Sequence, residues 1–165
     1  MIDFPVTSRS DDKFMPSVGV EYDLASDIMA YATYSYGFKA GGYDASAQGG
    51  IYGPETVNAY ELGLKGSWAG RRGTFSLALF RSDYSDLQET TILFTGTGES
   101  QRITAVTANA AGARAQGVEL SGSIQAADWF RINADIGYLD AIYTDFPNAS
   151  CTVLATAQNP NCVQD

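Results

Sequence analysis

A two-residue alternation of apolar and polar side chains recurs six times along the 165 residues of this chain. Every second position from Phe130 to Tyr138 is apolar or aromatic, whereas the positions between them are charged, polar or glycine. Because successive side chains of a β-strand point to opposite faces, this alternation predicts strands with one apolar face. No helical repeat of comparable length competes with it. We predict strands over about 14–23, 28–39, 56–68, 74–93, 109–126 and 129–144.

The connections between these segments alternate strictly between short and long. Residues 23–27, 69–73 and 126–128 form short connections, whereas 40–56, 94–108 and the tail after Tyr143 are long. In an antiparallel up-and-down meander, this order places all short turns at one end of the sheet and all long loops at the other. Outer-membrane barrels have this polarity, with short periplasmic turns and longer extracellular loops.

The apolar faces are free of charge over the central part of each segment. Arg81, Asp83 and Asp140 share this face only toward the long-loop end. The opposite face carries small and polar residues, and aromatic residues gather near both ends of the segments, as in the two girdles of a membrane barrel. We therefore interpret the meander as a membrane wall. The alternative is a soluble all-β sandwich, whose apolar faces would meet across a core.

Composition and charge restrict the chemistry. With no histidine, the chain lacks any Ser-His-Asp triad and any His-ligated metal site, and the carboxylates at Asp11-Asp12 and at Asp83 and Asp86 are too few for a calcium loop. A net charge of −9 argues against a nucleic-acid partner, which requires a basic patch. We expect no enzyme activity, no metal and no cofactor.

The two cysteines, Cys151 and Cys162, lie in a tail rich in Asn, Thr, Ala and Gln. Their spacing fits neither a CxxC redox motif nor a zinc site. A local disulfide that closes a surface loop is one interpretation, and it would imply an oxidising compartment. Two free thiols are the other.

Several blocks, in this order and spacing, resemble the barrel of TonB-dependent outer-membrane receptors. These blocks are Pro16–Tyr22, Ile28–Tyr43, Pro54–Lys65, Asp83–Gln88, Asn109–Gly112 and Gln116–Leu120. The resemblance covers about Ser10 to Asp145 and implies a 22-stranded transmembrane barrel filled by an N-terminal plug. Six strands do not close a membrane barrel, which needs at least about eight. The resemblance therefore implies an open slice of the barrel, without the plug.

The family captures a scarce nutrient, most often a ferric siderophore, at the outer membrane, with energy from the TonB complex acting through the plug. For this chain the resemblance implies outer-membrane lipid, the plug and the remaining barrel strands as partners. The tail, 145–165, resembles a disulfide-closed extracellular loop of the family. A soluble all-β binding module and a small porin-like barrel are the competing hypotheses.

Two sets of side chains are candidates for function. Ligand-binding candidates are the loop residues Lys39, Tyr43, Tyr52, Arg102 and Arg114, because cations and aromatic rings suit an anionic ferric chelate. The lumen-facing polar candidates are Glu61, Lys65, Glu119, Arg131 and Asp135. They are expected to bond to the plug or to lumen water.

Overall fold

The computed structural model describes residues 8–44, 50–95 and 102–145. These residues form an antiparallel six-stranded sheet in the order β1-β2-β5-β6-β7-β8, and a separate two-stranded pair, β3-β4. The bounds are β1 Ser17–Ala25, β2 Ile28–Lys39, β3 Gly42–Tyr43, β4 Ile51–Tyr52, β5 Glu55–Trp68, β6 Gly73–Thr95, β7 Arg102–Ala127 and β8 Phe130–Asp145. The predicted all-β up-and-down meander of six strands is confirmed. Within the described ranges, no helix is long and apolar enough to cross a membrane.

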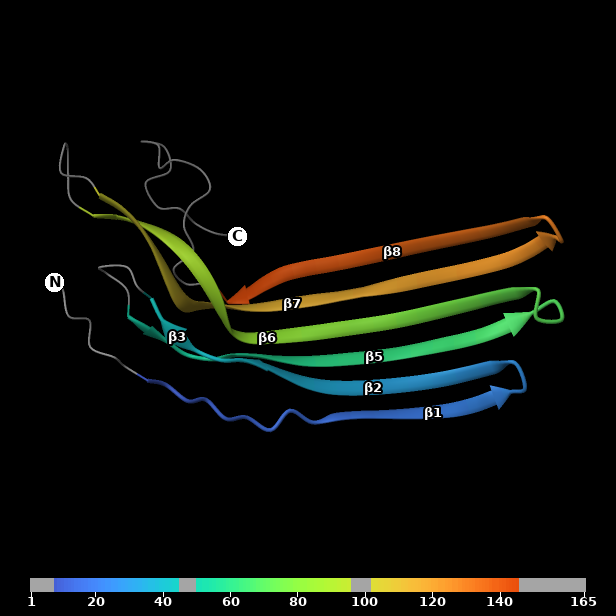
Figure 1. The fold of residues 1–165 in the computed structure, drawn as a ribbon, viewed down its shortest axis with the longest axis horizontal. Helices are drawn as coiled ribbons and strands as arrows, with labels where there is room; N and C mark the ends of the chain where they lie inside the picture. Colours follow the sequence, from blue (N-terminus) through green and yellow to red (C-terminus); the bar gives the residue numbers. More distant parts are fainter. Residues whose placement is uncertain (1–7, 45–49, 96–101, 146–165) are drawn as a thin grey trace.

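The six long strands lie side by side, with the short turns at one end and the long connections at the other (Figure 1). Ser26–Asp27 joins β1 to β2, and Asp128–Trp129 joins β7 to β8. The turn between β5 and β6 has positive φ at Ala69, Gly70 and Arg71. At the long-loop end, β6 and β7 bend together away from the other strands.

The register places the apolar positions of all six strands on one face. Leu62 pairs with Leu79 and Ala32, and Leu120 pairs with Leu77 and Ile136. We call this side the apolar face, and the other the polar face. The apolar band runs from the level of Ile124 and Ile132 to the level of Val118 and Tyr138. One register step further, Arg81 pairs with Gln116, which pairs with Asp140, so charge begins where the band ends.

The sheet is a single layer. Among the described residues, Tyr31 and Ala111 are the buried apolar side chains, with 8% and 7% of their surface exposed. Val20 and Ile136 on the apolar face remain 66% and 69% exposed, because nothing described covers them. This arrangement differs from a sandwich, in which two apolar faces would bury each other. Within the described ranges, the outer edges of β1 and β8 have no partner strand.

Three expectations need correction. The first strand begins at Ser17 rather than near residue 14: the Pro16 carbonyl still accepts the Tyr36 amide at 2.9 Å, but proline has no N–H to continue the ladder. The β6-β7 pair extends further than expected, because residues 102–108 pair with 89–95 instead of forming a loop. The 40–56 connection contains the unpredicted β3-β4 pair. The other strand ends agree with expectation to within two residues.

Candidate functional site

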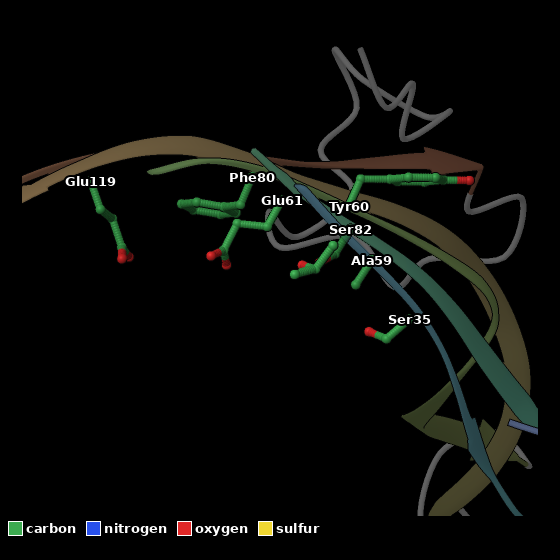
Figure 2. A pocket seen from close by; sticks show the side chains of 8 residues that line it. Ser35, Ala59, Tyr60, Glu61, Phe80, Ser82 and Glu119 are labelled. Carbon is green, nitrogen blue, oxygen red and sulfur yellow. The ribbon is translucent and has the colours of Figure 1, made fainter. Parts of the chain in front are cut away.

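The five predicted lumen-facing residues all project from the polar face. Glu61 and Lys65 come from β5, Glu119 from β7, and Arg131 and Asp135 from β8. In Figure 2 the side chains of Glu61 and Glu119 point to the same, concave side of the curved sheet, whereas Tyr60 points away from it. The alternation of the strands thus gathers three carboxylates and two cations on one curved wall.

A hydrogen-bonded cluster around Tyr31 occupies the centre of this wall. Tyr31 lies directly opposite Gly63, and its hydroxyl donates to Glu61 Oε1 at 2.6 Å. The ammonium of Lys65 lies 4.6 Å from the centre of the Tyr31 ring. Because Gly63 has no side chain, the ring lies flat over its backbone, where a Cβ would collide with it. The cluster therefore fixes a carboxylate and a cation by means of one aromatic ring.

A hollow of about 260 Å³ lies on the polar face next to this cluster (Figure 2). Glu61, Glu119 and Phe80 line it, together with small residues such as Ser35 and Ser82. The Phe80 ring lies over Gly117, where an added Cβ would be 2.7 Å from the ring. The hollow thus presents two carboxylates and an aromatic edge to whatever fills the concave side.

At the long-loop end, two amide side chains join the 40–54 connection to β6 and β7. Gln88 Nε2 donates to the carbonyls of Ala40 at 2.9 Å and Gly53 at 3.0 Å. Asn109 Nδ2 donates to the carbonyls of Gly53 at 3.0 Å and Asp86 at 2.7 Å, and Asn109 Oδ1 accepts the Gly53 amide. We call Gln88 and Asn109 the amide clasp, because they tie a loop to two strands distant in sequence.

Charged side chains add to this connection. The Glu55 carboxylate accepts hydrogen bonds from the backbone N–H of Gln88 at 3.1 Å and from Lys39 Nζ at 3.4 Å. The Arg9 guanidinium donates to Asp11 at 2.6 and 3.0 Å and to the Tyr52 carbonyl at 3.0 Å. The Arg9 hydrogen bond holds the pKa of the Asp11 carboxyl below its ordinary value. Asp44 accepts from the Thr107 amide.

Four of the five ligand-binding candidates lie at this end of the sheet. Lys39 ends β2 and Arg102 begins β7, while Tyr43 and Tyr52 belong to the β3-β4 pair. Tyr43 is exposed, and its hydroxyl donates to the Ser8 carbonyl at 3.4 Å. The structure thus brings two cations and two aromatic rings to the same end of the wall.

The expected loop position of Arg114 is wrong, since this residue lies inside β7. Its side chain is on the apolar face just beyond the apolar band, where Nε donates to Asp83 Oδ1 at 3.0 Å. Arg81 donates to the same carboxylate at 2.7 and 3.0 Å. Arg114 falls within the strand predicted over about 109–126, and its even position places it on the same face as Val118 and Leu120. Hydrogen bonds from Arg81, which has the larger effect, and from Arg114 hold the pKa of Asp83 below its ordinary value.

Some residues of this site were not among the predicted ones. Tyr31, Gln88, Asn109 and Arg9 make their contacts across strands or loops that are distant in sequence, and local spacing does not reveal such pairs. Gln88 and Asn109 do belong to the blocks Asp83–Gln88 and Asn109–Gly112, which resemble the receptor family, and this resemblance could have marked them as candidates. The pair Cys151 and Cys162, and the tail from residue 146 onward, lie outside the described residues.

Comparison with protein families supports a specific assignment. Residues 3–159 match the family described as TonB dependent receptor-like, beta-barrel. The ferric-pyoverdine M114 receptor PbuA of Pseudomonas sp. (strain M114) is 33% identical over 79 residues, which cover 48% of this chain and 10% of that receptor. This chain thus spans about a tenth of its curated relative.

Solved structures share the fold. The ferric yersiniabactin uptake receptor FyuA from Yersinia pestis superposes with a TM-score of 0.65 at 22% identity, covering 81% of this chain and 19% of that one. The alcaligin outer membrane receptor FauA from Bordetella pertussis gives a TM-score of 0.58 at 25% identity, covering 86% and 24%. The matched family and the shared sheet agree with the single-layered fold described above. The chain therefore belongs to the β-barrel family of TonB-dependent receptors of the bacterial outer membrane.

Proposed function

We propose that this chain is a wall segment of an outer-membrane receptor that takes up a ferric siderophore, with energy from the TonB complex. The observation that carries the proposal is the single-layered sheet with one charge-free apolar band and one polar, concave face. Such a sheet is stable where lipid covers the first face and water or protein covers the second. The siderophore is inferred from the relatives, which include receptors for ferric pyoverdine and ferric yersiniabactin.

In this proposal, further strands continue the sheet from the edges of β1 and β8 into a 22-stranded barrel. Lipid does not tolerate unpaired strand edges, because their N–H and C=O groups would lack hydrogen bonds. The polar face then lines the lumen. Glu61, Glu119, Lys65, Arg131 and Asp135 bond there to the plug or to water, and the plug carries the TonB contact.

The ligand enters from the long-loop end. Lys39, Arg102, Tyr43 and Tyr52 supply cations and aromatic rings for an anionic chelate. Arg114 is left out of this set because it is turned to the apolar face and paired with Asp83. The amide clasp holds Ala40 and Gly53, which flank the β3-β4 pair of Tyr43 and Tyr52, against β6 and β7.

Uptake of radioactive iron tests the proposal. Iron-starved cells with the gene deleted should lose TonB-dependent uptake of at least one ferric siderophore among hydroxamate, catecholate and mixed types. Complementation with the intact gene should restore it, and a protonophore should abolish it again. Unchanged uptake of every siderophore class in the deletion strain would overturn the function, though not the family.

A further inference from the structure

The segment that precedes β1 is bound to the β3-β4 region by two charged residues, Arg9 and Asp11. The Arg9 guanidinium donates two parallel hydrogen bonds to the Asp11 carboxylate, from Nε at 2.6 Å and from Nη2 at 3.0 Å. Its third nitrogen, Nη1, donates to the Tyr52 carbonyl at 3.0 Å. Asp11 Oδ2 also accepts the backbone N–H of Gly41 at 3.1 Å. We call Arg9 and Asp11 the latch, because this one ion pair binds residues near both ends of the 40–54 connection.

The latch is shielded from water. The side chains of Arg9 and Asp11 are 23% and 17% exposed, and in no other ion pair of the described ranges are both partners less than one quarter exposed. A Cβ on Gly41 would collide with the guanidinium, so the Arg9 side chain lies directly against the Gly41 backbone. Residues 12–15, which follow the latch, are exposed. The latch is therefore a discrete anchor and not part of a continuous strand.

The β3-β4 pair needs contacts beyond itself, since it consists of only two residue pairs. An isolated two-stranded hairpin is at best marginally stable in water. The amide clasp binds the residues just outside the pair, Ala40 and Gly53. The latch acts on the pair itself through the Tyr52 carbonyl, and the Tyr43 hydroxyl donates to the Ser8 carbonyl of the same segment at 3.4 Å.

We propose that Arg9 is a positioning residue for the ligand, because the latch fixes the β3-β4 pair and thereby the rings of Tyr43 and Tyr52. This inference rests on the proposed function, in which these two rings contact the ferric chelate. All three guanidinium nitrogens of Arg9 already donate to Asp11 and Tyr52, so Arg9 acts through the β3-β4 pair. Holding a binding loop in place before the ligand arrives raises affinity, because less conformational freedom is lost on binding.

Amide exchange of the full-length protein, without ligand, tests the latch. Arg9→Ala and Asp11→Ala should each accelerate exchange at Gly41 about tenfold, the effect of losing a hydrogen bond to a charged group. Asp12→Ala is the matched control, because Asp12 is exposed and makes no hydrogen bond or ion pair within the described ranges. Heat-modified mobility on gels verifies that each variant folds. Unchanged exchange at Gly41 in Arg9→Ala, or equal acceleration in the control, would overturn the latch.

Uptake kinetics test the role of Arg9 toward the ligand, with the radioactive ferric siderophore that the deletion strain fails to take up. Arg9→Ala should raise the half-saturating concentration about tenfold and leave the maximal rate unchanged, because the TonB step acts through the plug. Arg9→Lys keeps the charge but lacks the planar fork, so it should not restore the parent value.

Two results would overturn the positioning role: an unchanged half-saturating concentration in Arg9→Ala, or full rescue by Arg9→Lys, which would show that charge alone matters. If the parent strain takes up no siderophore, the ligand role falls together with the proposed function. Exchange at Gly41 then still decides whether the latch exists, so the two failures are distinguishable.

Discussion

Aromatic rings stabilise this sheet by covering the backbone of a glycine on the neighbouring strand. Tyr31 lies over Gly63 and Phe80 lies over Gly117, both on the polar face. A glycine in a strand interior has no side chain to pack, and a cross-strand aromatic ring covers its backbone. In a single-layered sheet, this contact substitutes for the core that two layers would make.

Gly63→Val should destabilise the protein by about 1–3 kcal/mol, because the new side chain collides with the Tyr31 ring and breaks its hydrogen bond to Glu61. The urea midpoint of gel-mobility unfolding in lipid vesicles measures this loss. Gly137→Val is the matched control on the same face, since nothing lies within 4 Å of its Cβ position. An equal change in both variants would show that the Tyr31 contact is not the cause.

Asp83 should make stability depend on pH in the acid range. Its pKa is lowered from the ordinary 3.8 by hydrogen bonds from Arg81 and then Arg114. A carboxyl whose pKa falls on folding contributes stability above its unfolded pKa and loses that contribution as pH drops through the lower, folded value. Urea midpoints measured from pH 6 downward should therefore fall below about pH 4. Asp83→Asn should be less stable at pH 6 and should lose this part of the acid sensitivity. A variant with the same acid profile as the parent would contradict the assignment.

The strands β6 and β7 are the longest of the sheet, and they extend furthest at its long-loop end. They contain 23 and 26 residues, whereas a tilted strand crosses a bilayer with about 9–11. The remainder projects beyond the apolar band and is bound to the 40–54 connection by the amide clasp. The projecting part thus binds Ala40 and Gly53, which lie near the two ends of this connection.

Asn109→Ala should loosen that connection. The variant loses the hydrogen bonds to Gly53, Pro54 and Asp86, and one such bond is worth about 0.5–1.5 kcal/mol. Amide exchange at Gly53 should accelerate about tenfold, since 1.4 kcal/mol corresponds to a factor of ten. Asn133→Ala, an exposed asparagine of β8, is the control and should leave exchange at Gly53 unchanged. Protection at Gly53 that survives the Asn109 change would argue against the clasp.

For the whole molecule, the decisive property is the opposite environment of the two faces. Adjacent residues test it, because Leu120 lies on the apolar face and Ser121 on the polar one. With Cys151 and Cys162 replaced by serine, Ser121→Cys should react with a hydrophilic maleimide in membranes. Leu120→Cys should react only after the membrane is dissolved in detergent. Equal reactivity of the two cysteines in intact membranes would contradict a lipid-covered apolar face.

The alternation in sequence predicted the six strands of the main sheet and which of their side chains share a face. Even positions from Phe130 to Tyr138 end on the apolar face because the side-chain period of a strand is fixed at two. The same rule placed Glu61, Lys65 and Glu119 together on the polar face. The pairing of residues 102–108 with 89–95 was not predicted, because nothing in residues 102–108 by themselves indicates their partner.

The sequence by itself determined the six main strands, their faces and the order of short and long connections, because these depend on neighbours in the chain. Only the tertiary structure decided which distant residues meet. Tyr31 contacts Glu61, Gln88 and Asn109 bind the Gly53 carbonyl, and Arg72 binds the Ala126 carbonyl. Register and strand curvature fix these contacts, and both arise from hydrogen bonds between segments that can be more than fifty residues apart.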